Sequence, residues 1–264
     1  MIRNLLYNCF APKWSSEWKP NIERLCQYAE AFNGRKIVLI KTGETEDAAK
    51  VEALFAPLGV VEFIHVPNDP DLGEVTGFIQ ALELLASTDP NEATFYAHTK
   101  GVKYKQPLER YMVAICSWRN RMYDECLSDP AKIEALLQQH ACVGCFLRSG
   151  RAIQVEGAAW HYAGTYWWVN HARLFSLPQW PEVAQTFWGV EGYLGRHLPE
   201  ESAHCLYGAD LKHNLYSTVG IFRCSCGHES RHRMKMTHLP VKVCRKCFKR
   251  TAEFLKHPPE VNFA

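Results

Sequence analysis

The first 150 residues alternate short apolar runs with longer segments in which apolar residues recur at helical spacing. This alternation is typical of parallel β-strands joined by helices. It predicts strands over Asn4–Phe10, Lys36–Lys41, Val60–Val66, Thr94–His98 and Cys142–Leu147. It predicts helices over Asn21–Phe32, Glu46–Phe55, Glu74–Ala86, Leu108–Leu127 and Pro130–His140. The expected fold class is therefore α/β, a mostly parallel sheet flanked by helices.

The pattern changes twice further along the chain. From Gln154 to Gly195 the periodicity weakens and Trp, Tyr, His and Gly become frequent, which favours the wall of a pocket over further regular strands. Between Tyr216 and Arg223 the composition turns basic and cysteine-rich. We therefore expect an α/β domain over residues 1–218 and a small module over residues 219–264.

Composition excludes several classes of protein. A hydrophobic fraction of 47% in 264 residues indicates a folded core rather than disorder. The longest apolar runs, such as Lys36–Ile40 and Val60–Val66, are far shorter than the roughly 20 residues that cross a bilayer. The N-terminus also lacks a basic-then-apolar signal segment, so we expect a soluble cytoplasmic protein, in the host cytoplasm if it is viral.

The formal net charge of +2 conceals an uneven distribution. Residues 223–257 hold ten Lys and Arg against two Glu, a net charge of +8. Residues 1–222 hold 20 Lys and Arg against 25 Asp and Glu, a net charge of −5. A mildly acidic body therefore carries a basic C-terminal segment.

Four cysteines in this basic segment have the spacing of a metal site. Cys224 and Cys226 are followed, after seventeen residues, by Cys244 and Cys247. Two thiolate pairs can hold structural Zn²⁺ tetrahedrally and stabilise a module too small for a core of its own. The first pair is more closely spaced than usual, which leaves open that a nearby histidine replaces one thiolate.

The other cysteines have a different expected role. The chain is too long for a disulfide scaffold, so we expect reduced thiols throughout. Cys142 and Cys145 lie in an apolar run, where we interpret them as core thiols rather than metal ligands.

A basic zinc ribbon can neutralise several phosphates, which makes nucleic acid the natural partner. A charged solvated surface around a structural metal, or a protein contact, is the alternative.

A second signal is the strand end His98-Thr99-Lys100-Gly101. The carboxyl ends of parallel strands face the ligand crevice of an open sheet. His and Lys there can stabilise charge on a phosphate, and Gly permits close approach of the backbone. An ordinary polar turn is the alternative.

A third signal is the aromatic run from Trp160 to Trp168, which contains His161, Gly164 and Thr165. Flat rings with polar neighbours suit a sugar or a base. Core packing is an equal alternative for Trp167 and Trp168.

These spaced motifs carry a resemblance. His98-Thr99-Lys100-Gly101, followed by His161-Tyr162-Ala163-Gly164-Thr165-Tyr166-Trp167-Trp168, resembles the GT-A-type glycosyltransferases of rhamnan and surface-polysaccharide synthesis, with H-[ST]-K-[GK] and G-N-[FY]-W-W. Asn68-Asp69-Pro70-Asp71 stands where that family has N-x-G-x-D, and Trp188-Gly189-Val190-Glu191 is similar to its terminal acidic segment. The resemblance covers about residues 1–215; Thr165 replaces the family's Asn, and the family does not ordinarily have a zinc ribbon.

The resemblance implies a GT-A-like, Rossmann-like sheet with a nucleotide-sugar donor, usually a UDP-sugar, over its carboxyl edge. Glu191 is then the catalytic base, although Asp71, Asp124 and Asp210 stay open for that role. The diphosphate lies near His98, Lys100 and Gly101, which makes His98 and Lys100 catalytic as well. The remaining implied contacts are Asn68 and Asp71 to the nucleoside, and His161, Gly164, Thr165, Trp167 and Trp168 to the sugar and acceptor.

Glycosyl transfer needs a carboxylate to take the acceptor proton and positive charge to stabilise the leaving diphosphate. That charge is supplied by Mg²⁺ or Mn²⁺ or by basic side chains. No Asp-x-Asp follows the fourth strand, and the sequence leaves the metal question open.

The function expected is transfer of a hexose or pentose to an acceptor hydroxyl. The basic ribbon suggests a hydroxymethylated base in DNA, as in viral DNA modification, with the base flipped from the duplex. The alternatives are a surface-polysaccharide transferase with a structural ribbon and a non-catalytic nucleic-acid-binding protein.

Overall fold

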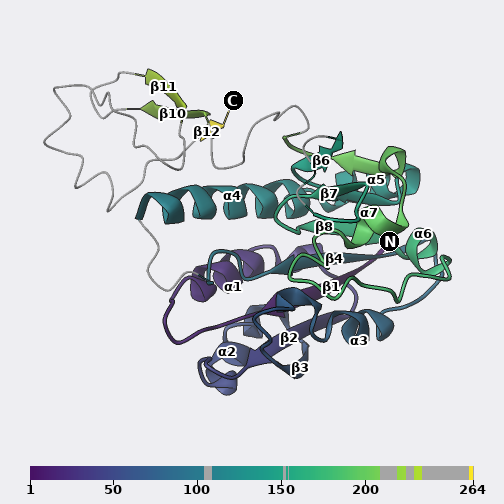
Figure 1. Ribbon diagram of the computed structural model, residues 1–264, viewed down its shortest axis with the longest axis horizontal. Coiled ribbons are helices and arrows are strands. Elements are labelled where there is room, and N and C mark those ends of the chain that lie inside the picture. Colours follow the sequence, from purple (N-terminus) through teal and green to yellow (C-terminus); the bar gives the residue numbers. More distant parts are fainter. Residues whose placement is uncertain are drawn as a thin grey trace, which may run out of the picture. The chain divides into compact units, whose positions relative to one another are not determined.

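The computed structural model describes residues 1–103, 109–150, 153, 155–208, 219–223, 229–233 and 262–263 (Figure 1). In chain order, the strands are β1 (Ile2–Cys9), β2 (Lys36–Thr42), β3 (Glu62–Pro67), β4 (Glu92–His98), β5 (Cys142–Gly144), β6 (Leu147–Ser149), β7 (Trp160–Tyr162), β8 (Trp167–Asn170), β9 (Ala203–Cys205), β10 (Val219–Arg223), β11 (Glu229–Arg233) and β12 (Asn262–Phe263). The α-helices are α1 (Trp18–Cys26), α2 (Ala48–Ala53), α3 (Phe78–Glu83), α4 (Glu109–Leu127), α5 (Pro130–Gln139), α6 (His171–Phe175) and α7 (Tyr193–His197). The 3₁₀ turns are η1 (Ala29–Ala31), η2 (Ala56–Leu58), η3 (Gly73–Val75) and η5 (Glu200–Ser202).

Seven strands form one sheet in the order β3-β2-β1-β4-β8-β5-β9. All neighbours pair in parallel except at β8, which is antiparallel to both β4 and β5. The expected α/β class with a mostly parallel sheet is confirmed. Within the described helices, no span is long and apolar enough to cross a membrane.

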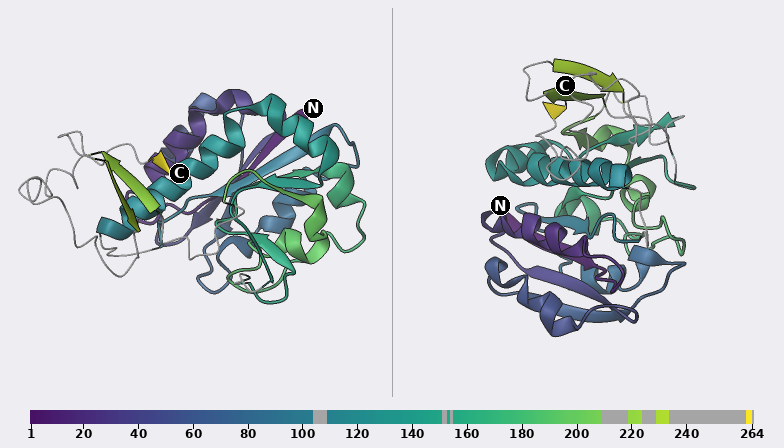
Figure 2. Two further views of the ribbon diagram at one scale, coloured as in Figure 1. Left: turned by 90° about the horizontal axis from the view of Figure 1, so that it is seen from above. Right: turned by 90° about the vertical axis from the view of Figure 1, so that its left-hand side faces the viewer.

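Each face of the sheet is covered, so its central strands are buried on both sides. Register aligns Leu5 with Phe95 and Leu6 with Tyr96, and successive side chains point to opposite faces. Helices α3, α6 and α7 supply core residues to the face that carries Leu6 and Tyr96. Figure 2 shows helices on both sides of the strands.

The strands differ from the sequence expectation in several places. The segment Gln154–Gly195, for which the sequence favoured a pocket wall over regular strands, contains β7 and β8, and β8 pairs with both β4 and β5 inside the main sheet. The edge strand β9 was not expected either. The predicted strand Cys142–Leu147 is two strands, β5 and β6, because Phe146 adopts a left-handed backbone conformation with φ of 58°. Cys142 and Cys145 are fully buried, which confirms that they are core thiols, and burial raises the pKa of Cys142 to about 12.

The predicted helix Glu74–Ala86 is also divided, into η3 and α3. Gly77 separates the two with φ of 80°, and a Cβ atom there would lie 2.8 Å from Val66 Cγ1. Only glycine fits this turn without strain. Glu74 consequently stands on a tight turn rather than on a continuous helix.

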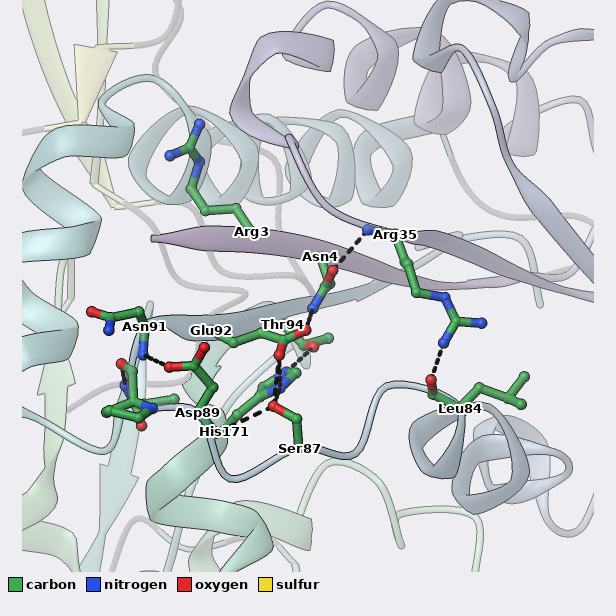
Figure 3. Close-up of polar contacts among 12 residues, drawn as sticks. Arg3, Asn4, Arg35, Leu84, Ser87, Asp89, Asn91, Glu92, Thr94 and His171 are labelled. Atoms are coloured by element: carbon green, nitrogen blue, oxygen red, sulfur yellow. Dashed lines mark hydrogen bonds and ion pairs between the residues drawn. The ribbon is translucent and has the colours of Figure 1, made fainter.

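Polar side chains gather at the amino ends of β1 and β4, as Figure 3 shows. Asn4 Nδ2 donates to Glu92 Oε1 at 2.8 Å, and the backbone N–H of Arg35 donates to Asn4 Oδ1 at 2.7 Å. His171 Nε2 lies 2.7 Å from Thr94 Oγ1. This partly buried network joins β1, β4, α6 and the residue before β2 at the edge opposite to the one that ligands use in such sheets, so we interpret it as structural.

Trp167 and Trp168 lie on opposite faces of β8 and are each 1% exposed. Trp167 stacks on Tyr96, with ring centroids 5.0 Å apart, whereas Trp168 packs on Phe95 at 5.2 Å. Trp168 Nε1 also donates to the carbonyl of Cys126 at 2.9 Å. That carbonyl belongs to the last turn of α4, where helical acceptors lack partners within the helix. Trp168 therefore caps α4 as well as filling the core.

Because Trp168 caps α4, we expect replacement by Phe to destabilise the protein more at Trp168 than at Trp167. Trp168→Phe and Trp167→Phe both leave a cavity, but Trp168→Phe also removes the bond to Cys126, while Trp167 Nε1 has no hydrogen-bond partner among the described residues. We expect Trp168→Phe to lower the free energy of unfolding by about 1 kcal/mol more than Trp167→Phe. Urea unfolding of the two variants measures this difference, and equal costs would contradict the capping role.

The chain divides into two compact units, residues 1–105 with 119–210 and residues 106–118 with 211–264. In the second unit β10 pairs antiparallel with β11 and with β12. The expected boundary at residue 218 stays a prediction. The four expected zinc ligands, Cys224, Cys226, Cys244 and Cys247, lie outside the described residues.

Candidate functional site

The strand order changes direction between β1 and β4, which places a crevice at their carboxyl ends. The two ends are joined through Thr99. Its backbone N–H donates to Asn8 O at 3.1 Å, while its hydroxyl donates to Phe10 O at 3.0 Å and accepts from Phe10 N at 2.9 Å. These bonds fix the start of the His98–Gly101 motif at the change of strand order.

His98 uses both ring nitrogens. Nδ1 lies 3.0 Å from Glu74 Oε1, and Nε2 lies 3.1 Å from the carbonyl oxygen of Gly164. His98 is thus held between the carboxylate of Glu74 and the carbonyl of Gly164 at the strand end.

Glu74 is held by contacts from several elements. Its Oε2 accepts from the hydroxyl of Tyr96 at 2.9 Å, and its carbonyl accepts from Asn8 Nδ2 at 3.1 Å. Burial raises the pKa of Glu74, but His98, the Tyr96 hydroxyl and Lys100 outweigh it and lower the pKa below its ordinary value. Glu74 is thus an ionised partner that fixes His98. Nothing in the sequence distinguishes Glu74, because the apolar pattern places it in a predicted helix.

Glu191 is the second carboxylate of this group. Its side chain is 15% exposed, and Oε1 accepts from the backbone N–H of Gly164 at 3.1 Å. Burial raises the pKa of Glu191, although Lys100 and the Gly164 N–H oppose the rise. A carboxylate with a raised pKa is better suited to accept a proton near neutral pH than an exposed one.

Gly164 connects the acidic Glu191 with the basic His98. Its carbonyl contacts His98 and its N–H contacts Glu191. Gly164 has φ of 97° and Thr165 has φ of 63°, both in the left-handed region. This tight turn directs the N–H of Gly164 toward Glu191 and its carbonyl toward His98.

Lys100 brings further positive charge to the group. Its backbone is held by Asn21, whose Oδ1 accepts from Lys100 N at 2.9 Å and whose Nδ2 donates to Lys100 O at 3.0 Å. Burial lowers the pKa of Lys100 to about 8, while the charges of Glu191 and Glu74 oppose the lowering. The contact of Asn21 with Lys100 was not predicted, because in the sequence Asn21 is one polar residue among others in a helix.

The aromatic segment is more deeply buried than a contact surface would be. His161 and Thr165 are each 1% exposed. His161 Nε2 lies 3.9 Å from Glu191 Oε1, and burial together with Arg148 lowers the pKa of His161 to about 4. The burial of Trp167 and Trp168 favours the core alternative for those two rings.

Asn68 and Asp71 stand at the same edge of the sheet but follow β3, with β2 and β1 between them and β4. The backbone N–H of Asn68 donates to Thr42 O at 2.9 Å, and that of Asp71 donates to Asp69 Oδ1 at 2.9 Å. Among the other candidate bases, Asp124 pairs with Arg24 and the Tyr28 hydroxyl. Asp210 lies outside the described residues.

A cavity of about 530 Å³ opens at the carboxyl end of β2. Lys41 lines it, 2% exposed, with Nζ donating to Thr76 O at 2.6 Å. Burial lowers the pKa of Lys41 to about 8, opposed by Glu74 and Asp69. The signal in the sequence for this position is a lysine directly after the apolar run Ile37–Ile40. The other lining residues are Lys13, Ile40, Thr42, Gly43, Thr45, Glu46, Asp47, Ala48 and Lys50.

No three His, Cys, Asp or Glu side chains gather as a metal site within the described part of the chain. At the end of β4, Glu74 is engaged by His98 and Tyr96, and Glu191 accepts from Gly164. Lys100 adds a cation to the same group. These residues present paired charges rather than a preformed set of ligands for Mg²⁺ or Mn²⁺.

No family model and no curated protein matches the sequence. Among solved structures, the chain is similar to a mycobacterial protein at 12% identity, with 89% of this chain and 84% of that chain covered and a TM-score of 0.43. It is similar to glucosyl-3-phosphoglycerate synthase from Mycobacterium tuberculosis, solved with Mn²⁺, UDP and phosphoglyceric acid, at 12% identity, 91% and 88% coverage and a TM-score of 0.37. These likenesses are too distant to carry an argument about substrate or mechanism.

Proposed function

We propose that the protein is a glycosyltransferase that moves a sugar from a nucleoside diphosphate to an acceptor hydroxyl. The observation that carries this proposal is that Glu191 and His98 both contact Gly164 near the change of strand order, with Lys100 in electrostatic interaction with Glu191. A carboxylate with a raised pKa beside basic side chains is the combination that glycosyl transfer requires. The motif resemblance of residues 1–215 supports the same activity.

In the proposed reaction Glu191 takes the proton of the acceptor hydroxyl. The acceptor oxygen forms a bond to the anomeric carbon as the bond from that carbon to the diphosphate oxygen breaks. The diphosphate leaves with the electron pair, and its added negative charge is stabilised by Lys100 and His98. This single displacement inverts the anomeric configuration.

The donor nucleotide is proposed to extend from the His98 motif toward the cavity at the end of β2. Lys13, Lys41 and Lys50 line this cavity and outnumber its acidic residues, Glu46 and Asp47, so its lining favours an anionic nucleotide. UDP is the nucleotide that the motif resemblance favours. The nucleoside contacts expected from Asn68 and Asp71 stay predictions.

We propose that leaving-group charge is met by Lys100 and His98 without a required divalent metal. Both residues lie at this strand end, where Glu74 contacts His98 and Lys100 interacts electrostatically with Glu191 and Glu74. Addition of a chelator should therefore leave most of the activity, and complete loss that Mn²⁺ restores would contradict this part of the proposal.

The test is incubation of the purified full-length chain with a panel of UDP-sugars, with release of UDP measured with and without acceptors. We expect slow donor hydrolysis without acceptor and faster release when a suitable hydroxyl is present. Glu191→Gln serves as the inactive control. UDP binding without hydrolysis or transfer, for every donor in the panel, would favour the non-catalytic alternative.

The hydroxymethylated-DNA acceptor and the structural zinc are predictions that rest on the sequence of residues 223–257. Removing residues 223–264 should abolish binding to hydroxymethylated DNA if the basic segment presents it. Zinc content of the full-length and shortened proteins reports on the four cysteines in the same samples.

A further inference from the structure

Two adjacent aromatic side chains stand out at the surface. Phe187 is 38% exposed and Trp188 is 47% exposed, whereas the other tryptophans named above are buried in the core. Their ring centroids are 5.0 Å apart with an interplanar angle of 82°. We call Phe187 and Trp188 the aromatic corner.

The aromatic corner is built against η3, the turn that carries Glu74. Gly73 has φ of 54°, and a Cβ atom there would lie 3.1 Å from the ring of Phe187. On the other side of Glu74, Val75 lies beneath Gly189, where a Cβ atom would come within 2.7 Å of Val75 Cγ2 and 2.0 Å of Ala184 O. Both glycines are thus needed for close packing of the corner on the turn that fixes His98.

Two more connections join the corner to the candidate site. Lys103 Nζ lies 5.0 Å from the ring centroid of Phe187 and 5.3 Å from that of Trp188, and Lys103 is the second residue after the His98–Gly101 motif. The carbonyl of Trp188 accepts from Gly192 N at 3.1 Å, so Glu191 lies within the same turn. The corner therefore adjoins the residues proposed to hold the reacting groups.

We propose that the aromatic corner binds a saccharide acceptor and presents its hydroxyl to Glu191. This inference rests on the proposed function, because it assigns the acceptor of the same reaction. The C–H face of a pyranose packs on an exposed indole, while its hydroxyl edge stays free for polar partners. Trp188 is then the residue that determines acceptor specificity.

Two observations favour a saccharide over a nucleic acid at this surface. The two rings are almost perpendicular, so they form a corner for a puckered ring and cannot sandwich a flat base between parallel faces. The aromatic corner belongs to the mildly acidic residues 1–222, with a net charge of −5, and not to the basic residues 223–257 on which the prediction of nucleic-acid binding rests.

The experiment compares Trp188→Ala with Leu84→Ala in the full-length chain. Leu84 is a matched control because it is an exposed apolar residue, 45% exposed, at the end of α3. Binding of short rhamnose, glucose and mannose oligosaccharides is followed by saturation-transfer NMR, and UDP binding is measured on the same samples. Thermal unfolding shows that each variant is folded.

We expect Trp188→Ala to weaken saccharide binding about tenfold and Trp188→Phe to retain most of it. Leu84→Ala should leave saccharide affinity unchanged. The expected loss is confined to the saccharide, with UDP affinity within about twofold of the parent chain.

Three results would overturn the assignment: equal saccharide affinity in the parent and Trp188→Ala proteins, no saccharide binding by the parent protein, or binding of single-stranded DNA that Trp188→Ala weakens instead. Failure of the proposed function gives a different pattern. In that case the parent protein neither binds UDP nor hydrolyses UDP-sugars, whatever the aromatic corner binds.

Discussion

Glu191→Gln is expected to lower kcat by about 10²–10⁴-fold, the usual contribution of a general base. Glutamine keeps the size of the side chain and an oxygen that can accept from Gly164 N, but it cannot take a proton. In the parent protein, activity should rise as pH passes through the raised pKa of Glu191, because the ionised form is the base. The variant should lose this rise, which steady-state kinetics across pH measures.

Asp124→Asn provides the matched control for that substitution. Asp124 pairs with Arg24 and the Tyr28 hydroxyl, in contacts that the proposed reaction does not use. We expect its kcat to keep the pH dependence of the parent protein. A Glu191→Gln variant with normal kcat, or with an unchanged acidic limb, would show that another group is the base.

Lys100→Met is expected to lower kcat by about 10²–10³-fold, because it removes a cation from the leaving diphosphate. The pKa of Lys100 is about 8, and the protonated form is the one that stabilises negative charge. Activity of the parent protein should therefore fall as pH rises through about 8. The profile of kcat against pH is the measurement.

Lys100→Arg separates charge from position. A guanidinium stays protonated over this range, so the alkaline fall should move to higher pH even if kcat is lower throughout. An alkaline limb that stays near pH 8 in Lys100→Arg would assign it to a group other than Lys100.

Local sequence patterns predicted most of the sheet because buried parallel strands are short, apolar and bounded by polar segments. The expected strands Lys36–Lys41 and Thr94–His98 correspond to β2 and β4, which extend the ranges by one and two residues. The pattern failed where single residues adopt left-handed backbone conformations. Phe146 divides an expected strand, and Gly77 divides an expected helix.

Only part of the candidate site could be predicted from the sequence. His98, Lys100 and Glu191 were named from motifs. In the structure His98 and Glu191 both contact Gly164, and Lys100 interacts electrostatically with Glu191. Glu74 was not named, because nothing in its neighbours along the chain indicates that its side chain reaches β4. The sequence left two roles for Trp167 and Trp168, core packing and contact with a ligand. Periodicity cannot distinguish a buried ring from one that lines a crevice.

The sequence by itself determined the α/β class, the separate basic segment and the residue types that glycosyl transfer needs. These three features depend on composition and on the spacing of residues along the chain. The spacing of apolar residues decides which segments form strands or helices and which of their faces is buried. Only the tertiary structure decided which groups meet: Glu74 with His98, Glu191 with Gly164, and Phe187 with the exposed Trp188. Such contacts join residues far apart in sequence, and their pKa values follow from burial and partners that exist only after the chain has folded.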